Sequence, residues 1–537
     1  MYNEFRTMSE ESDECLTKGI CAVNPTLSSL HEIILLYLIG VAFYYTKLPE
    51  SSIANSEEIK NAILYSLFTV ITNADYNQEL FHTITEKLYD YINQLRILYE
   101  KSCLEQNAEI QTLKAYFKYS KGFDLTDAIR KGEKYFIKKT QSLSPRQKDL
   151  YDIAVFICKS IGIKLIELKK LSKTHEQSFN TILSLLNNLS PGNFSEETII
   201  KEIDTSIDAY YDLARTNFYT QIELYGDLGL TEVSFSTQEG KAILVSGFDF
   251  KQLELVLKAV EGTDINVYTH GLEMLMAHSF PKLHSHPNLK GHFGTGLESS
   301  LIDFASFPGP ILMTKCTLQR IDYLFRGRLF TLDPVAPMGV VRLKDNDLEP
   351  LIKSAQESKG FTHIQTKPSL TVGFNEKELF KVMDNVIDKV KKGDIKHIYF
   401  VGLSNAPNFA YKEYFTKFFN LLPKDAFVFS LSYPINKDNV FHLDAFYDYT
   451  LMYKCLRRLR ENFALKDLNL HMFLTKCDKH TISNLLYLRH IGIRDVYMCK
   501  CPPTLISPTL ITTLQEVFGV KEFSEPGKEI EETTKDS

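Results

Sequence analysis

Side chains that bind metals or carry protons follow several predicted strands of this sequence. They include the thiols of Cys316 and Cys477 and the imidazole of His270. Because parallel strands end at a common edge of their sheet, such side chains would gather there, and a metal or redox site is a candidate. Phe248 and Tyr433 occupy equivalent places and favour packing instead. The polar residues that follow strands are Asp249, His270, Glu273, Cys316, Ser404, Cys477, Asp478, Cys499 and Cys501.

No standard motif decides among these chemistries. His270, Glu273 and His278 have the side chains of a zinc site, but polar residues between a loop and a helix explain them equally well. The glycines of 291–296 are not in the order of a dinucleotide-binding loop. The sequence also contains no Walker loop, no nucleophile elbow and no His-Glu-x-x-His pair.

The spacing of the cysteines does not identify a metal site either. Cys499-x-Cys501 lacks the second pair of a structural metal site, and Cys15 and Cys21 do not have Cys-x-x-Cys spacing. A thiolate cluster of Cys477, Cys499 and Cys501 stays a separate possibility, since these residues follow neighbouring predicted strands.

Glycine and proline divide the chain into two parts. Residues 1–225 hold 6 of the 25 glycines and 4 of the 19 prolines. Since these residues mark turns and are costly inside helices, the first part is predicted to be helical and the second α/β. The lysines between 164 and 173 are interpreted as the solvated face of a helix. Apolar residues recur with helical spacing over 30–46, 57–72, 79–101, 147–171 and 195–218.

Short β-branched runs begin after Gly226, each followed by a helical stretch. The predicted strands are 242–246, 265–269, 310–314, 397–401, 427–431, 470–475 and 495–498. Apolar strands that alternate with helices are typical of parallel sheets covered on both faces. We therefore predict a multidomain chain, with a helical domain at 1–225 and two Rossmann-like α/β domains with mainly parallel sheets at 226–368 and 369–523. The acidic, polar residues 524–537 are predicted to form a disordered tail.

Composition and charge exclude several classes of protein. With 61 basic and 67 acidic residues and a net charge of −6, the chain has no electrostatic footprint for nucleic acid or an anionic membrane. The apolar run 33–45 is shorter than the about 20 residues of a membrane span and predicts a buried helix. The N-terminus lacks signal and transit features, so a cytoplasmic location is expected. Nine cysteines favour reduced thiols over a disulfide framework.

Ordered blocks along the chain resemble the hybrid cluster protein family, also called the prismane or hydroxylamine reductase family. Residues 14–25, with Cys15 and Cys21, resemble the second half of its N-terminal cysteine motif. The resemblance implies a helical domain of two three-helix bundles, followed by two α/β domains that hold a hybrid iron–sulfur–oxygen cluster. It also implies an iron–sulfur cluster at the N-terminal motif. The other blocks are 67–73, 242–247, 267–271, 307–314, 370–374, 397–402 and 506–508.

The resemblance implies one histidine, two glutamates and four cysteines as ligands of the hybrid cluster. Matched by position, Glu273 and Asp478 stand for the glutamates and Cys316 for one cysteine. A one-residue insertion makes Leu272 a competing match for Glu273, and His480 replaces a nearby lysine. The positions without a family ligand are Phe248 in place of the histidine, and Ser404, Tyr433 and Phe446 in place of cysteines.

These replacements oppose assembly of the cluster. Iron–sulfur centres are held by thiolates, and a phenyl ring offers no donor. Tyr433 would have to ionise, although tyrosine has an ordinary pKa of about 10. The first Cys-x-x-Cys pair of the N-terminal motif falls within 2–12, which has no cysteine, so Cys15 and Cys21 are a remnant.

Two functional hypotheses follow. The first is a degenerate member of the family, without cofactor or reductase activity, that has a binding or regulatory role with an unidentified protein partner. The alternative is an oxidoreductase of the hydroxylamine or nitric oxide reductase type with an altered iron centre. Glu273, Cys316 and Asp478 would then hold the metal, an external redox donor would supply electrons, and His480 is a candidate proton donor.

Overall fold

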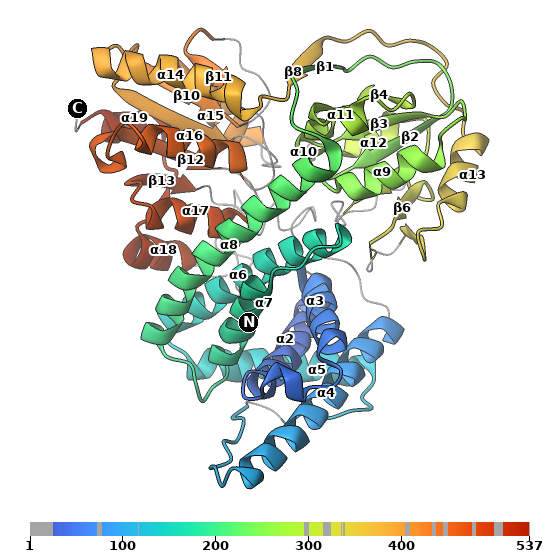
Figure 1. Cartoon of the computed structure of the whole chain (residues 1–537), viewed down its shortest axis with the longest axis vertical. Helices are drawn as coiled ribbons and strands as arrows, with labels where there is room; N and C mark the ends of the chain where they lie inside the picture. Colours follow the sequence, from blue (N-terminus) through green and yellow to red (C-terminus); the bar gives the residue numbers. More distant parts are fainter. Residues whose placement is uncertain are drawn as a thin grey trace. The chain divides into compact units, whose positions relative to one another are not determined.

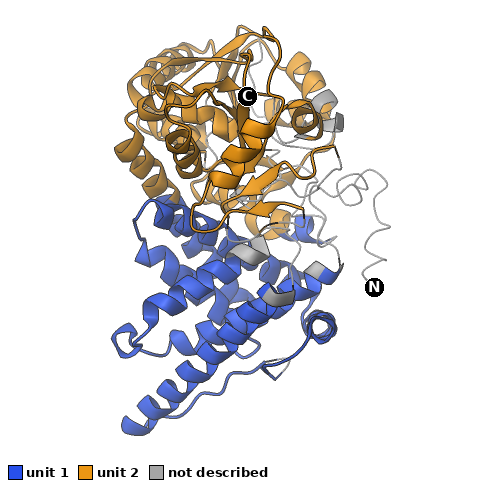
Figure 2. Ribbon diagram, turned by 90° about the vertical axis from the view of Figure 1, so that its right-hand side faces the viewer, with its two compact units in different colours: residues 1–8, 21–213, 507–513 blue, residues 9–20, 214–506, 514–537 orange. Residues whose placement is uncertain are grey.

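The computed structural model of the chain begins with helices and continues with alternating strands and helices (Figure 1). It divides into two compact units, which Figure 2 colours separately. The first comprises Cys21–Leu213 and Ser507–Thr513, and the second comprises Ala214–Ile506 and Leu514–Ser537. The domain boundaries at 225, 368 and 523 stay predictions. The structure describes residues 25–71, 78–115, 118–294, 300–314, 324–333, 336, 339–402, 409–431, 437–443, 449–474, 480–498 and 509–535.

Helices α2 to α8 form the N-terminal region. Capping residues mark where two of them begin. Asp124 caps the N-terminus of α5. Ser144 and Gln147 form a capping box at the N-terminus of α6, with a proline at its first helical position. The bounds are α2 Pro25–Tyr45, α3 Ser56–Ile71, α4 Gln78–Glu105, α5 Leu125–Ser142, α6 Pro145–Lys170, α7 Glu176–Asn188 and α8 Glu196–Tyr225.

Helix α2 is the central helix of the first unit. It contacts α3, α4, α5 and α7. Its window Ser28–Tyr45 is long and apolar enough to cross a membrane, but 89% of that window is buried inside the protein. The prediction of a buried helix over 33–45 is therefore confirmed. Helix α5 approaches α2 closely at Gly132, where an added Cβ would lie 2.0 Å from the carbonyl oxygen of Ser29.

Charged side chains are buried between α2, α5 and α6. Lys139 of α5 is 1% exposed and donates to both carboxylate oxygens of Glu32, at 2.9 and 2.8 Å. Thr513, in the first turn of α18 (Leu510–Phe518), donates to Oδ2 of Asp149 at 2.8 Å. The prediction of a solvated lysine face on α6 is wrong at Lys164, which is 2% exposed and pairs with Glu167 at 3.2 Å.

Six parallel strands form the first sheet, in the order β4-β3-β2-β5-β6-β7. The central strands β2 and β3 are buried throughout. The strands are β2 Ala242–Ser246, β3 Asn266–His270, β4 Leu289–His292, β5 Ile311–Met313, β6 Leu329–Thr331 and β7 Val341–Arg342. The helices of this region are α9 Phe250–Ala259, α10 Leu272–Leu275, α11 Pro281–His284, α12 Ser300–Ser306 and α13 Glu349–Glu357.

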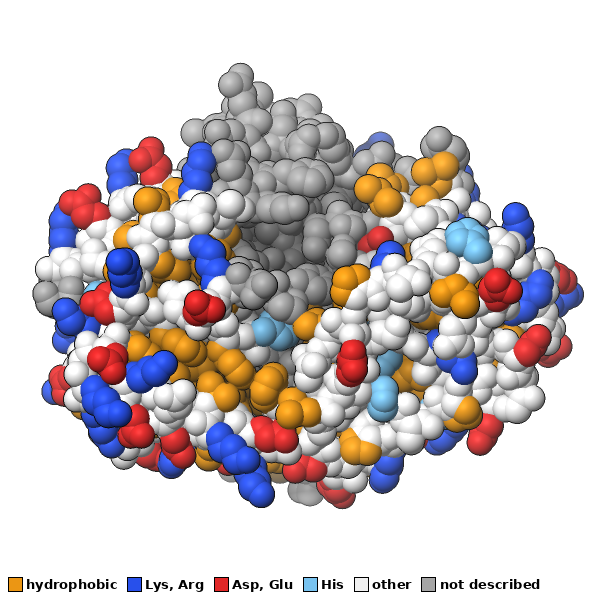
Figure 3. All heavy atoms as spheres, turned by 90° about the horizontal axis from the view of Figure 1, so that it is seen from above, with side chains coloured by type: hydrophobic (Ala, Val, Ile, Leu, Met, Phe, Trp, Pro, Cys, Tyr) orange, Lys and Arg blue, Asp and Glu red, His pale blue; other side chains and the backbone are white. Residues whose placement is uncertain are grey.

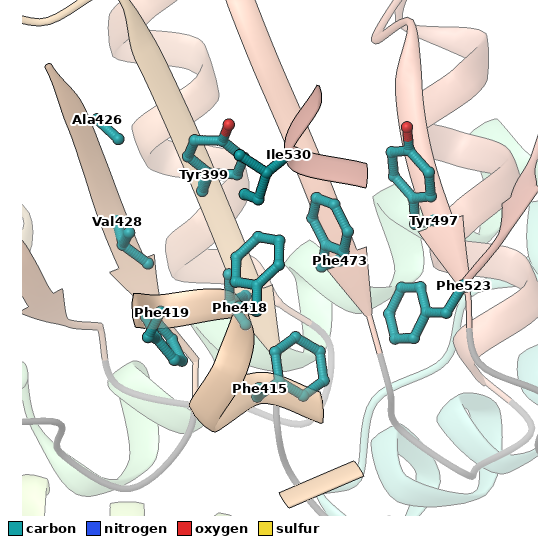
Figure 4. Close-up of a cluster of buried hydrophobic side chains, with 11 residues drawn as sticks. Tyr399, Phe415, Phe418, Phe419, Ala426, Val428, Phe473, Tyr497, Phe523 and Ile530 are labelled. Atoms are coloured by element: carbon teal, nitrogen blue, oxygen red, sulfur yellow. The ribbon is translucent and has the colours of Figure 1, made fainter. Parts of the chain in front are cut away.

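The second sheet repeats this strand order. It runs β11-β10-β9-β12-β13-β14, again with parallel pairs only. One face carries an aromatic cluster that includes Tyr399, Phe418 and Phe473 (Figure 4). The strands are β9 His397–Gly402, β10 Ala426–Ser430, β11 Val440–His442, β12 Asn469–Leu474, β13 Asp495–Met498 and β14 Lys521–Glu522. The helices are α14 Glu376–Lys392, α15 Phe409–Leu421, α16 Thr450–Arg460 and α17 His480–His490.

A small antiparallel sheet precedes the second α/β region. It pairs β1 (Thr231–Ser234) with β8 (Ser369–Val372). The predicted fold class, a helical region followed by α/β regions with parallel sheets, is confirmed.

The predicted disordered tail is wrong for most of its length, because Pro526–Thr534 forms helix α19. Ile530 joins the aromatic cluster of the second sheet, and Tyr414 donates to Glu529 at 2.7 Å. Contacts of a few side chains therefore hold this acidic segment in a helix against the second sheet. The average composition of the segment did not reveal these contacts.

Candidate functional site

The carboxyl ends of β2 and β5 are joined by the hydroxyl of Thr314. This hydroxyl accepts hydrogen bonds from the backbone N–H groups of Phe248 at 2.9 Å and Asp249 at 3.3 Å. It donates to the carbonyl oxygen of Ser246 at 3.0 Å. Chain order reverses between β2 and β5, and open α/β sheets bind ligands at such a switch point. The loop that carries Phe248 is therefore fixed at the position where this fold places ligands.

A buried amide bridges two carboxylates beside this loop. Asp249 caps α9 by accepting from the N–H of Gln252. The Gln252 side chain donates to Asp249 at 3.3 Å and to Asp333, which follows β6, at 2.7 Å. The N-terminus of α9 is thus occupied by a carboxylate, and this arrangement opposes the binding of a phosphate there.

Ser246, His270 and Asp303 form a chain of hydrogen bonds across β2, β3 and α12. Ser246 Oγ lies 2.9 Å from His270 Nδ1, and His270 Nε2 lies 3.2 Å from Asp303 Oδ2. These residue types occur in hydrolase triads, but Ser246 and His270 are both 0% exposed. A nucleophile must reach its substrate. These three hydrogen-bonded side chains therefore hold the strand ends together and do not perform acyl transfer.

Two further histidines share the hydroxyl of Thr269. His278 Nε2 lies 2.9 Å and His292 Nδ1 2.8 Å from Thr269 Oγ1. Burial, with the nearby His284, lowers the pKa of His278 to about 3, and burial lowers the pKa of His292 well below its ordinary value. Both imidazoles are therefore neutral near pH 7 and act as hydrogen-bonding core residues.

Two of the positions matched to cluster ligands lie at this edge of the first sheet. Glu273, in α10 after β3, is 4% exposed, and Leu272 beside it is also buried. Phe248 is partly exposed, after β2. Among the described residues, no group of three or more histidine, cysteine, aspartate or glutamate side chains is placed to hold a metal ion.

The remaining positions matched to family ligands, and the other candidate thiols, lie outside the described residues. This holds for Cys15, Cys21, Cys316, Ser404, Tyr433, Phe446 and Asp478, for the thiols Cys477, Cys499 and Cys501, and for the side chain of His480. Those numbered from 404 to 501 follow strands β9 to β13 of the second sheet in sequence. Their roles stay predictions.

Sequence reasoning missed Thr314, Asp303 and Asp333. Thr314 could have been found, because it ends a predicted strand inside a block that resembles the family. Asp333 follows β6, a strand of three residues that the pattern did not reveal. Asp303 had no signal, since its partner His270 is 33 residues away in sequence.

The fold defines a class of protein before any relative is considered. Both six-stranded sheets have the doubly wound order in which strands 3-2-1 lie on one side of the switch point and 4-5-6 on the other. A helical region precedes the two sheets. The chain is therefore a helical and α/β protein with two doubly wound parallel sheets.

The chain belongs to the Prismane/CO dehydrogenase family, whose model matches residues 11–445. It is 27% identical to a hydroxylamine reductase of Acidiphilium cryptum over 529 residues, covering 94% of this chain and 93% of the relative. It is 26% identical to a hydroxylamine reductase of Zymomonas mobilis over 530 residues, covering 96% of this chain and 95% of the relative. A third hydroxylamine reductase, of Methanocella arvoryzae, is 27% identical over 97% of both chains.

Proposed function

We propose that this member of the family keeps the fold, does not assemble an intact hybrid cluster, and acts by binding or regulation. The observation that carries the proposal is Phe248. Thr314 holds its backbone at the carboxyl end of β2, where the resemblance implies a histidine ligand. A phenyl ring there offers no electron pair to iron, whereas the buried carboxylate of Glu273 still does.

The other replacements support the same proposal. Phe446 has no donor atom, and Ser404 and Tyr433 offer oxygens in place of thiolates at the matched positions. Soft thiolates bind iron–sulfur centres, and neutral hydroxyls do not replace them. The residues present therefore do not fit the seven-ligand cluster that the resemblance implies, so no reaction step is assigned to it.

Charges of both signs are mixed on the surface of the protein that Figure 3 shows. Lysine, arginine, aspartate and glutamate side chains are interspersed on the face seen in Figure 3, which supports the expectation of no nucleic-acid ligand. A protein partner and a cytoplasmic location remain part of the proposal.

Iron and acid-labile sulfide, measured on the anaerobically purified full chain, test the proposal. We expect less iron than one atom per chain and no hydroxylamine-dependent oxidation of a reduced electron donor. Several iron atoms per chain together with sulfide would overturn the proposal.

The alternative is an oxidoreductase with an altered iron centre, favoured by the relatives named hydroxylamine reductase along nearly their whole length. Glu273, Cys316 and Asp478 would hold the metal, with His480 as a candidate proton donor and an external redox donor. On this alternative, Cys316→Ala removes the bound metal, whereas Cys103→Ala, at a buried thiol of α4, leaves it. Equal metal content in both variants would exclude this site.

A further inference from the structure

Four polar side chains form a chain of contacts across the amino-terminal ends of the second sheet. Lys521 of β14 lies 2.7 Å from Asp495 Oδ1 of β13. Asp495 Oδ2 lies 2.9 Å from Nδ1 of His471 on β12, and His471 Nε2 lies 3.3 Å from Nδ1 of His397 on β9. Both histidines are buried, so water cannot replace these contacts.

The hydrogen bond between the two imidazoles limits how many protons they hold. His471 donates from Nδ1 to Asp495, so its Nε2 accepts when the ring is neutral, and His397 Nδ1 donates to it. One added proton is tolerated, because either ring can serve as the donor. Two added protons place an N–H on both facing nitrogens, which removes the hydrogen bond and sets two positive charges about 3 Å apart.

The charged groups around the pair come from every neighbouring strand. His397 faces Asp425, which precedes β10, and the adjacent Lys396. His471 faces Asp495 and Lys521. Although burial alone would raise it, hydrogen bonds from His471 and Lys521 lower the pKa of Asp495 to about 2, so this carboxylate stays charged at every relevant pH.

Tyr399 connects the pair to helix α19. Its ring centroid lies 4.6 Å from that of His471, and its hydroxyl lies 2.9 Å from Oγ1 of Thr533 in α19. Ile530 of the same helix packs into the aromatic cluster beside Tyr399 (Figure 4). Glu532 accepts a further bond from Tyr497 at 3.3 Å. Tyr399 is thus held by His471 on one side and by α19 on the other.

We propose that the His397–His471 pair makes the packing of α19 on the second sheet sensitive to acid. When both rings carry an added proton they separate, Tyr399 loses its support, and α19 detaches from the sheet. This inference is independent of the proposed function.

The sign of the effect follows from proton binding. Burial lowers the pKa of both histidines in the packed state, with the neighbouring His471 adding to the effect at His397. In the detached state they return toward about 6.5. The detached state therefore binds more protons, and detachment increases as the pH falls below 6.5, by up to about tenfold per pH unit for each proton. Above pH 7.5 the packing is independent of pH.

Hydrogen exchange of residues 526–535 in the full chain, measured from pH 5 to 8 and corrected for intrinsic exchange, tests the proposal. The native chain should show an opening constant that rises below pH 6.5. His397→Gln should reduce the rise, because only His471 then takes up a proton on detachment and the amide can donate to it or accept from it. The control His363→Gln, at an exposed histidine that contacts Thr362, should keep it. No rise in the native chain, or an undiminished rise in His397→Gln, would overturn the proposal.

A second measurement needs no variant. The assigned resonances of His397 and His471 in the selectively labelled native chain should both titrate below pH 6.5, together with the opening of α19. If His397 or His471 titrates at or above pH 6.5, the proposal is wrong.

Discussion

Replacing Asp152 by asparagine should stabilise the helical unit at neutral pH. Asp152 lies on α6 beside the buried charges of α2 and α5, and its Oδ2 has no hydrogen-bond partner among the described residues. Burial raises the pKa of this carboxyl to about 6, against the opposing effect of Lys139 and Lys148. The folded chain therefore holds an unfavourable negative charge at pH 7.5.

The size of the effect follows from this shift. The difference between about 6 in the folded chain and the ordinary 3.8 is 6 − 3.8, or about 2 pKa units. Each unit corresponds to 1.36 kcal/mol, so ionisation of Asp152 costs up to about 3 kcal/mol. Because the folded pKa is raised, this cost is present above pH 6 and disappears as the pH falls toward 4. Asp152→Asn should thus gain about 3 kcal/mol at pH 7.5 and about half of that at pH 5.

Amide exchange of α2, α5 and α6 at the two pH values measures the stability of the helical unit. A local measurement is needed because the chain has two compact units, so a single unfolding free energy would not describe either one. Asp204→Asn, at an exposed aspartate of α8, is the matched control and should change little. Equal protection of Asp152→Asn and the native chain at pH 7.5 would refute the reasoning. So would a gain that does not shrink at pH 5.

Two further substitutions test close packing and the switch point. Gly132→Ala should cost about 1–3 kcal/mol or more in the helical unit, because its Cβ would lie 2.0 Å from the Ser29 carbonyl. Amide exchange of α5 checks this, with Gly527→Ala, whose Cβ meets nothing within 4 Å, as the control. Thr314→Val should cost about 1–3 kcal/mol and speed exchange at Phe248 and α9, because three backbone contacts lose their hydroxyl. Thr314→Ser keeps the hydroxyl, so an equal loss in both variants would contradict the role assigned to it.

The sequence predicted the central strands well. The predicted strands 242–246 and 495–498 have the same bounds as β2 and β13. Continuous apolar runs identify strands that are buried on both faces. The edge strands β7 and β14 were missed, since each has two residues and is partly or fully exposed. A burial pattern cannot mark such short strands.

The candidate site was less predictable. The positions of Phe248 and Glu273 beyond strand ends followed from the sequence. The bonds of Thr314 to the loop 65 and 66 residues earlier did not, because they depend on which strands become neighbours. Lys164 shows a similar limit, since helical spacing did not reveal that Glu167 pairs with it inside the unit.

The bond between Asp149 and Thr513 affects the order in which the chain can fold during synthesis. The two residues are 364 positions apart, yet both belong to the first compact unit. At 5–20 residues per second, the ribosome reaches Thr513 roughly 20–70 s after Asp149. Most of the helical unit is therefore synthesised early, but the unit is completed only near the end of synthesis. During that interval Asp149 lacks the hydrogen bond from the Thr513 hydroxyl.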